Sequence, residues 1–506
     1  MRRKKARAAR EQASAPKLSW NDMGYHQGPT YPYDILSKED AQGIIEASID
    51  LLRDVGIGFE PDEELTQLFG DAGCTIGDDG IVRFPSELVR DALDGMAKSV
   101  KVWNRDGTDF MEINNRSTRF LTGMTCIKVY DIETGEHRDS TRDDLAMITR
   151  VADALPHIDG MSMGVKNVEE SDIHGEIDEF VAMAENTTKP LEYLCEHAES
   201  FDVVIDIATA IRGSREELKA KPYFMHLITP LPLFYGKTHS DQIIAGVKAG
   251  VPILMGTLSI GGASGPITMA GCLVHSVATD LAGMVLGQLV EKGSFCIGGS
   301  DASFMEAATG GVGAYSQSSL ADMAMCQISR ELGMPSLTGI AGCCQARRFN
   351  QDAVWELSAG MMQTFYSRPA TVDYMGSIDE GITYSLHALL YVHELAGLLR
   401  NMWKGIEVND DTMAIDLTKQ EGPRGNYLAQ EHTARHCRTE VWNAKYLGAN
   451  LPVSSGALAD VDLFDRIDED LRQILDTHQP EPLNEAVAAK IADIQRSFRE
   501  TWTQND

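Results

Sequence analysis

The sequence has few positive charges for its length. It contains 45 Lys and Arg residues against 75 Asp and Glu residues, which gives a net charge of −30 at pH 7. Nucleic-acid binding depends on basic faces that neutralise phosphates, so this balance argues against a nucleic-acid-binding protein. Proline is also scarce, at 18 of 506 residues, and 43% of the residues are apolar. The composition is that of a globular chain with a large core, and it excludes a disordered or fibrous protein.

Several short motifs of common enzyme classes are absent. The nine cysteines are odd in number and have no CxxC spacing, which argues against a disulfide framework and a zinc ribbon. The sequence also lacks GxSxG, P-loop and HExxH motifs. These absences make nucleophilic hydrolysis, phosphoryl transfer and zinc-protease chemistry poor explanations of its function. Reduced thiols are the simpler interpretation and predict a cytoplasmic protein.

No apolar run is long enough to predict a membrane span. The most apolar segment, residues 253–290, is interrupted by glycines and Pro266 and contains Asp280. The first ten residues, MRRKKARAAR, resemble the charged part of a signal peptide, but EQASAPK follows where an apolar core would be needed. We therefore expect no membrane association, and we interpret residues 1–30 as a disordered or draped basic tail.

Residues 31–150 are predicted to form an N-terminal α+β element. Helical spacing of apolar residues begins after Ser37 and Asp40, which suit a helix N-cap and capping box. Short β-rich runs such as residues 118–121 and 127–130 follow, and Gly80 and Gly135 lie in turn signals between such runs.

From residue 151 to 455 the pattern is that of a parallel α/β fold. Seven apolar segments are separated by helical stretches, and they begin near Ile158, Pro190, Pro222, Pro252, Ser294, Pro335 and Pro369. With an eighth strand near residues 413–417, this rhythm predicts a (β/α)8 TIM-type barrel, with residues 456–506 as a C-terminal helical tail. An open doubly wound sheet is the alternative, but no GxGxxG follows its first strand.

Polar and aromatic residues near the ends of these segments are the candidate site. Reacting groups of such barrels lie at the carboxyl ends of the strands. Glu192 and Glu196–His197 lie there in the second segment, and the selected substrate-binding candidates are Asp301, Phe304, Gln345, Arg347, Arg348, Gln351, Trp355, Glu356, Asp373 and Tyr374. Aromatic rings with carboxylates can hold a cation that donates no hydrogen bond, and arginine can hold a carboxylate. The alternative is that these are ordinary core, turn and surface residues.

One pair of histidines has metal-ligand spacing. His432 and His436 are four residues apart in a predicted helix and Cys437 follows them. Zinc needs at least a third ligand, which the sequence does not place, so we predict no metal and expect a structural helix here.

Five segments, in order along the chain, resemble the trimethylamine methyltransferase family. They are residues 52–60 (LRDVGIGFE), 130–141 (YDIETGEHRDST), 153–156 (DALP), 265–271 (GPITMAG) and 425–433 (GNYLAQEHT). The resemblance covers about residues 30–500. It implies a (β/α)8 barrel that passes a methyl group from a methylated amine to the cobalt of a cognate corrinoid protein, with no cofactor bound in this chain itself. We also expect a homo-oligomer.

The chain differs from the archaeal trimethylamine enzymes of this family at one place. Those enzymes carry pyrrolysine late in the barrel, at a position that falls within residues 345–355, where this chain reads QARRFNQDAVW. The chain therefore resembles the pyrrolysine-lacking branch, whose members demethylate quaternary amines such as glycine betaine. A trimethylamine:corrinoid methyltransferase, a non-catalytic quaternary-amine binding protein and an enzyme of unrelated chemistry on the same barrel are the alternatives.

Overall fold

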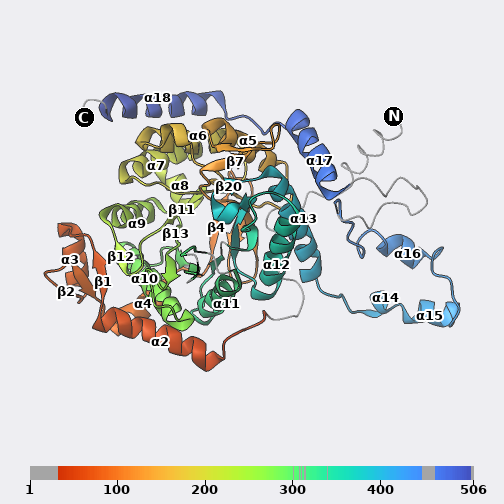
Figure 1. Cartoon of the computed structure of the whole chain (residues 1–506), viewed down its shortest axis with the longest axis horizontal. Helices are drawn as coiled ribbons and strands as arrows, with labels where there is room; N and C mark the ends of the chain where they lie inside the picture. The colour runs from red at the N-terminus through yellow and green to blue at the C-terminus, as the bar shows by residue number, and fades with distance from the viewer. Residues whose placement is uncertain are drawn as a thin grey trace.

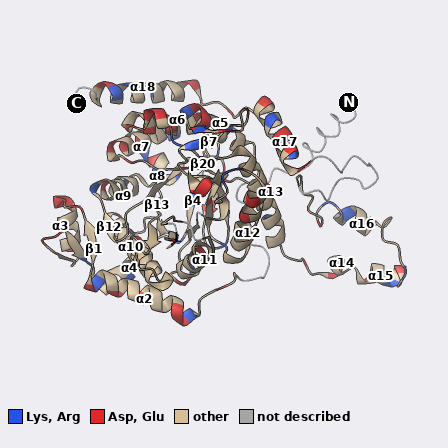
Figure 2. Cartoon of the chain, in the orientation of Figure 1, with Lys and Arg blue, Asp and Glu red and all other residues tan. Residues whose placement is uncertain are grey.

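The computed structural model describes residues 32–299, 301–306, 308, 310–312, 315–338, 340–446 and 462–502. The predicted tail at residues 1–30 and the boundary between residues 455 and 456 lie outside this range. Figure 1 shows a body of parallel strands surrounded by helices, with a thin arm and two C-terminal helices outside it. Figure 2 shows charged residues, coloured red and blue, along outer helices such as α17 and α18.

Eight parallel strands form two sheets at the centre of the body. One sheet has the order β15-β13-β11-β10-β9 and the other β17-β18-β6. Their bounds are β6 Arg119–Thr122, β9 Met161–Ser162, β10 Leu191–Tyr193, β11 Phe224–Ile228, β13 Ile253–Met255, β15 Cys296–Gly298, β17 Leu337–Thr338 and β18 Thr371–Met375. A parallel bridge between Leu121 and Gly160 joins the two sheets between β6 and β9. All seven strands expected between residues 158 and 375 are confirmed.

The eighth predicted strand is wrong. Residues 413–417 end one short helix and begin the next, because Ala414 adopts a left-handed conformation between them. The eighth parallel strand is β6, which pairs with β18. It lies before residue 151, inside the segment expected to be a separate α+β element.

Helices alternate with these strands along the chain. Each parallel strand is followed by at least one of them: α5 Arg142–Asp153, α6 Ile173–Asn186, α7 Ala198–Arg212 with α8 Arg215–Ala220, α9 Lys237–Ala249, α10 Met269–Val290, α11 Tyr315–Glu331, α12 Gln351–Ser367 and α13 Leu386–Trp403. By length and composition α10 could cross a membrane, but 72% of its apolar window is buried inside the protein. It is therefore placed as a core helix, and Ser48 of the N-terminal element donates a hydrogen bond to its Val274 carbonyl at 3.2 Å.

The part of the chain before β6 mixes helices with short strands. Ser37 caps its first helix by accepting a hydrogen bond from the Asp40 N–H at 3.0 Å. Its elements are α2 Lys38–Asp54, β1 Ile57–Phe59, α3 Glu63–Asp71, β2 Thr75–Ile76, β3 Ile81–Arg83, α4 Ser86–Gly95, β4 Val100–Trp103 and β5 Phe110–Ile113. Strand β1 pairs with β12, Phe234–Tyr235, which fixes this element to the body.

Two small sheets extend the structure beyond the carboxyl ends of the parallel strands. Strands β14 (Leu258–Gly261) and β16 (Asp301–Phe304) pair in parallel after β13 and β15. The other small sheet has the order β19-β20-β7-β8 and comprises β19 Ser377–Ile378, β20 Thr383–Tyr384, β7 Lys128–Tyr130 and β8 His137–Asp139. Both extensions follow directly from parallel strands, so they lie around the carboxyl-end face.

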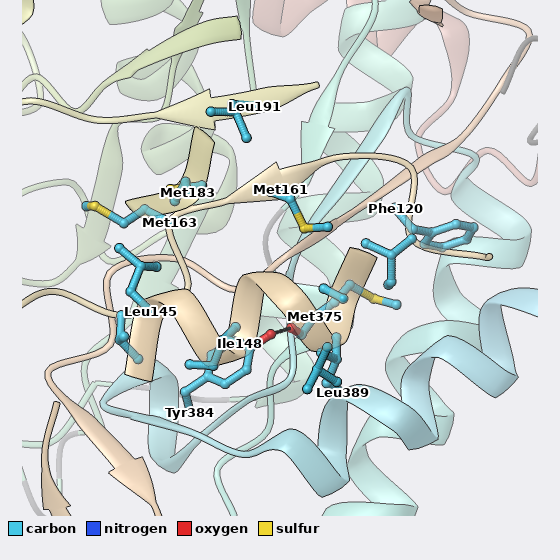
Figure 3. Packing of buried hydrophobic residues seen from close by; sticks show 14 of the residues in the cluster. Phe120, Leu145, Ile148, Met161, Met163, Met183, Leu191, Met375, Tyr384 and Leu389 are labelled. Atoms are coloured by element: carbon cyan, nitrogen blue, oxygen red, sulfur yellow. Dashed lines mark hydrogen bonds between the residues drawn. The ribbon is translucent and has the colours of Figure 1, made fainter. Parts of the chain in front are cut away.

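Apolar side chains fill the space between strands and helices. Figure 3 shows Phe120, Met161 and Leu191 on strands facing Ile148 of α5 and Leu389 of α13. The Tyr384 hydroxyl in the same cluster donates a hydrogen bond to the Met375 carbonyl at 2.9 Å. The 3.6-residue period of the helices and the twofold period of the strands place these residues on the same buried layer.

After α13 the chain leaves the body. Residues 404–446 carry three short helices, α14 Asp410–Met413, α15 Ile415–Glu421 and α16 Glu431–His436, and none of the three contains a buried residue. Figure 1 shows them in an extended arm. The last two helices, α17 Leu463–Thr477 and α18 Glu485–Trp502, lie against the outside of the body. They fall within the segment for which the sequence predicts a helical tail.

Candidate functional site

Two carboxyl groups meet in the interior of the parallel strands. Glu192 lies in the middle of β10, between Leu191 and Tyr193, whose side chains pack among the surrounding helices. Because side chains alternate along a strand, Glu192 points to the opposite side, towards Asp373 of β18 and Ser162 of β9. Both carboxyl residues are almost fully buried.

Burial raises the pKa of the Glu192 carboxyl to about 7, although its interactions with Ser162 and Asp373 act in the opposite direction. A buried carboxyl loses the hydration that stabilises its charged form, and a second carboxyl beside it makes double ionisation costly. Glu192 is therefore only partly ionised near neutral pH, so that the pair Glu192–Asp373, which we call the acid pair, carries less than two full negative charges. Two acids in the interior of a strand set are costly to the fold and are a functional-site signal.

Two further buried glutamates hold the loops at the carboxyl-end face. Glu176 of α6 accepts a hydrogen bond from His197 Nδ1 at 2.9 Å, and it also accepts one from the Ser200 hydroxyl. Glu179, one turn later, accepts a hydrogen bond from the Asn167 N–H. Burial raises the pKa of Glu179 to about 7, against the lowering effect of that N–H. These contacts fix the β9–α6 and β10–α7 loops, which follow the carboxyl ends of β9 and β10.

The backbone is strained where two neighbouring strands end. Tyr374 has φ 60° and Thr125 has φ 50°, a left-handed conformation that non-glycine residues rarely adopt. The pairing of β18 with β6 also shifts register between Val372 and Met375. Such strain concentrates at functional sites, because only a rigid surrounding structure can maintain it.

The segment after β17 contributes a half-buried carboxylate. Glu356 Oε2 accepts a hydrogen bond from the Gln345 N–H at 2.6 Å, which holds the loop onto the start of α12. The Gln345 side chain donates to Glu380 at 3.3 Å, next to the small sheet formed by β19 and β20. Glu356 and Gln345, both predicted site residues, therefore lie together.

Other predicted residues of this segment lie towards solvent. Arg347 is 84% exposed and its Nε lies 3.2 Å from Asp379, whereas Arg348 approaches Glu136 only at 3.9 Å. Trp355 is 66% exposed, and Gln351 is exposed at the start of α12. The structure thus does not bring these four side chains to the buried acid pair, because they lie on the outward faces of a loop and a helix.

The remaining predictions fall on the β14–β16 extension and on β18. Phe304 is buried in β16, close to Gly261 of the partner strand. Asp301 is the first residue of β16, and its side chain lies outside the described part of the structure. Tyr374 is half-buried and its ring lies beside Gly381.

Sequence reasoning selected Asp373 but not its partner. Glu192 lies near the end of the second predicted strand but is not among the predicted substrate-binding residues, and the sequence makes no prediction for Ser162, Glu176 or Glu179. Glu192 had a usable signal, since a carboxylate within the apolar run Pro-Leu-Glu-Tyr-Leu must face a polar interior or be costly. The glutamates of α6 had none, because acidic residues on a helix usually face solvent.

Comparison with known proteins identifies the family. The family model for trimethylamine methyltransferase (MTTB) matches residues 2–500. The chain belongs to this family. A trimethylamine methyltransferase MttB of Desulfitobacterium hafniense (strain DSM 10664 / DCB-2) is 28% identical over 466 residues, covering 90% of this chain and 92% of the relative. The resemblance seen in the five sequence segments is thereby confirmed.

Other relatives at similar identity include enzymes named for trimethylamine and one named for glycine betaine. The MttB of Methanosarcina barkeri (strain Fusaro / DSM 804) is 27% identical, covering 89% of this chain and 92% of the relative. A glycine betaine methyltransferase of Desulfitobacterium hafniense (strain Y51) is 25% identical, covering 91% and 96%. Among solved structures, the hydroxylamine complex of MtmB matches with a TM-score of 0.51 at 13% identity and covers 88% of each chain. The chain is therefore similar to methyltransferases in sequence and to MtmB in fold.

Proposed function

We propose that this protein moves a methyl group from a quaternary amine of the betaine type to the Co(I) of a cognate corrinoid protein. Membership of the family supports methyl transfer from a methylated amine. The observation that carries the choice of a cationic substrate is the acid pair, Glu192 with Asp373, in the interior of the parallel strands.

We also infer that the eight parallel strands close into a (β/α)8 barrel. The bridge from β6 to β9 joins the two sheets on one side. On the other side, a Cβ placed on Gly299 would lie 2.2 Å from the Cβ of Leu337, so β15 and β17 run side by side. Eight strands, each followed by a helix, support the same architecture. The substrate then enters at the carboxyl-end face, where the loops held by Glu176 and Glu179 lie.

A quaternary ammonium group suits direct displacement. Co(I) donates an electron pair to the methyl carbon, the new carbon–cobalt bond forms, and the old carbon–nitrogen bond breaks with its electrons passing to nitrogen. The leaving group is a neutral tertiary amine, so no proton transfer is needed. A free tertiary amine would leave as an amide anion unless it were first protonated or captured. The protein's part is to hold the substrate with its methyl group open to the partner's cobalt.

The acid pair can attract the substrate's ammonium group without binding it too strongly. The positive charge of the substrate disappears as the carbon–nitrogen bond breaks, so strong binding of that charge would slow the reaction by stabilising the ground state. A pair in which Glu192 is partly protonated attracts the ammonium group less strongly than two full carboxylates would. We therefore assign Glu192 and Asp373 to orienting the cation. Tyr374, which follows Asp373 on β18, and Phe304 on β16 are the aromatic candidates on these strands.

The carboxylate of a betaine needs a separate partner. The sequence suggests Arg347 or Arg348, both of which lie on the loop after β17. In this structure Arg347 pairs with Asp379 at the surface, so it would have to exchange that carboxylate for the substrate's. Trp355, on the same segment, is the further aromatic candidate for the cation.

We place the corrinoid on a separate protein rather than in this chain, and we propose a cytoplasmic homo-oligomer. Trimethylamine is the second candidate substrate. It is favoured by the relatives named for it, which are 28% and 27% identical to this chain, against 25% for the glycine betaine methyltransferase.

The test is methyl transfer to a Co(I) corrinoid protein of the methylamine systems, followed by the absorption change as methyl-Co(III) forms. Glycine betaine, carnitine, choline and trimethylamine are compared at equal concentrations. We expect turnover with glycine betaine to exceed that with trimethylamine by at least tenfold. Preference for trimethylamine would contradict the assigned substrate, and binding of glycine betaine without methyl transfer would support a non-catalytic binding protein.

A further inference from the structure

The arm outside the body lacks the usual sources of stability. Its helices have four, seven and six residues and no buried side chain. Helices this short are marginal in water without tertiary packing. The arm also exposes a set of large apolar residues: Ile406, Val408, Met413, Ile415, Tyr427, Leu428 and Val441. Something other than a hydrophobic core must hold α14 and α16 in register.

Three potential metal ligands converge where these two helices meet. His432 and His436 lie one turn apart on α16, and their ring centroids are 4.4 Å apart. His436 Nε2 lies 3.0 Å from Asp411 Oδ2, and His432 Nε2 lies 3.0 Å from the Asp411 backbone carbonyl. One ligand atom from each of the three residues lies within 4.8 Å of the others. Asp411 is the third ligand that the sequence alone leaves unplaced.

We propose that Asp411, His432 and His436 bind one divalent transition-metal ion, with zinc preferred, and that this ion ties α14 to α16. Two imidazole nitrogens and one carboxylate oxygen form a donor set typical of zinc, and water can fill the fourth tetrahedral position. Tetrahedral bonds of about 2.0 to 2.1 Å require the donor atoms to move closer together than in the ion-free arrangement. Rotation of the two half-buried imidazole rings can provide that movement.

A neighbouring arginine orients the carboxylate. Arg435 donates to Asp411 Oδ1 at 2.8 Å and to Oδ2 at 3.3 Å. The same guanidinium also repels a cation. Removing Arg435 therefore has a different expected effect from removing a ligand.

This proposal is independent of the methyl-transfer reaction. The three residues belong to the arm, whereas the acid pair lies inside the body (Figure 1). Failure of zinc binding would leave the proposed function unchanged, and failure of methyl transfer would leave the metal site unchanged.

The experiment uses the tag-free full-length protein, treated with a chelator and dialysed. Calorimetric titration with Zn²⁺ should show one equivalent bound, and Co²⁺ should give the visible absorption bands of a tetrahedral N/O site. Asp411→Asn, His432→Ala and His436→Gln should each weaken Zn²⁺ binding by at least about 100-fold, since loss of even an outer-shell partner costs about 10 to 100-fold. Glu431→Gln, an exposed neighbour on α16, is the matched control and should bind as the parent does.

Arg435→Ala separates a metal site from a purely structural cluster. If the ion binds Asp411, removal of the competing guanidinium should tighten Zn²⁺ binding by a few-fold. Limited proteolysis gives a second measurement, since bound Zn²⁺ should slow cleavage within residues 404–446 in the parent and not in His432→Ala. Absence of stoichiometric Zn²⁺ binding in the parent, or equal binding in the parent and all three ligand variants, would overturn the proposal.

Discussion

The buried charges inside this protein are arranged in two opposite ways. At the amino ends of the strands, Asp159 lies between Arg119 and Arg400 and also accepts the Phe120 N–H at 2.7 Å. Lys189, just before β10, donates hydrogen bonds to the backbone carbonyls of Ala152 and Leu155, both at 2.8 Å. Farther along the strands, the acid pair brings together two groups of the same sign. The first arrangement stabilises the fold, whereas the second is a cost that we attribute to function.

The largest effect on stability is expected at the amino-end cluster. Asp159→Asn should lower the free energy of unfolding by about 3 to 5 kcal/mol, because it leaves two buried guanidinium groups without their carboxylate. Denaturant unfolding followed by circular dichroism measures the change. Asp54→Asn, which removes an exposed ion pair with Arg53, is the control and should cause no measurable change. A small effect of Asp159→Asn would show that this cluster does not differ from a surface pair.

The acid pair should respond in the opposite sense. Glu192→Gln is expected to leave the free energy of unfolding at pH 8 unchanged or higher, because it removes a buried ionisable group. Methyl transfer from a quaternary amine should fall by at least about tenfold, as for loss of a charge-assisted contact of about 1.4 kcal/mol. kcat/KM and unfolding are measured on the same preparation. Destabilisation with full activity of the folded protein would make Glu192 a structural residue.

The pH dependence provides a sharper version of this comparison. Burial raises the pKa of Glu192 from an unfolded value of 4.5 to about 7, so between these values the native state binds more protons than the unfolded state. Its contribution to stability therefore falls as pH rises from about 4.5 to about 7 and is constant above that range.

Activity should rise with pH instead, since ionisation of Glu192 adds negative charge beside the substrate cation. We expect kcat/KM for a quaternary amine to rise through about pH 7 in the parent and to be flatter in Glu192→Gln. A rise of the same size in both proteins would assign it to another group.

The smallest effect is expected at the exposed arginine. Arg347 is 84% exposed and its ion pair with Asp379 is at the surface, where such contacts contribute little. Arg347→Ala should change choline turnover by less than about twofold, and glycine betaine turnover by less than about threefold unless the side chain exchanges Asp379 for the substrate carboxylate. A loss above tenfold on glycine betaine alone would establish that exchange, and the parallel variant Arg348→Ala tests the neighbouring candidate.

Much of the strand order could be predicted because it has a local cause. Five of the seven predicted strands follow a proline, and each is a short apolar run after a helical stretch. Strand β6 could not be assigned in this way, since it is followed by the β7–β8 hairpin rather than directly by a helix. It therefore looked like the rest of the N-terminal element, although long-range pairing with β18 places it among the parallel strands.

The candidate site was only partly predictable for a similar reason. Asp373 could be selected from its place in an apolar run, but its proximity to Glu192 depends on the curvature of the whole strand set. The sequence also does not show which candidate side chains face solvent. The predicted site therefore includes the exposed Trp355 and Arg347 together with buried residues such as Asp373. The contact of Asp411 with His432 joins two segments of the arm whose spacing follows no helical or strand period.

The most direct test of the account is a single assay of methyl-Co(III) formation on the corrinoid protein, with the parent, Glu192→Gln and Asp159→Asn compared per mole of folded protein. The account predicts that the parent uses glycine betaine in preference to trimethylamine, that Glu192→Gln loses at least about tenfold in kcat/KM, and that folded Asp159→Asn retains parental activity. Equal activity of the parent and Glu192→Gln on glycine betaine would contradict the assignment of the acid pair to the substrate cation.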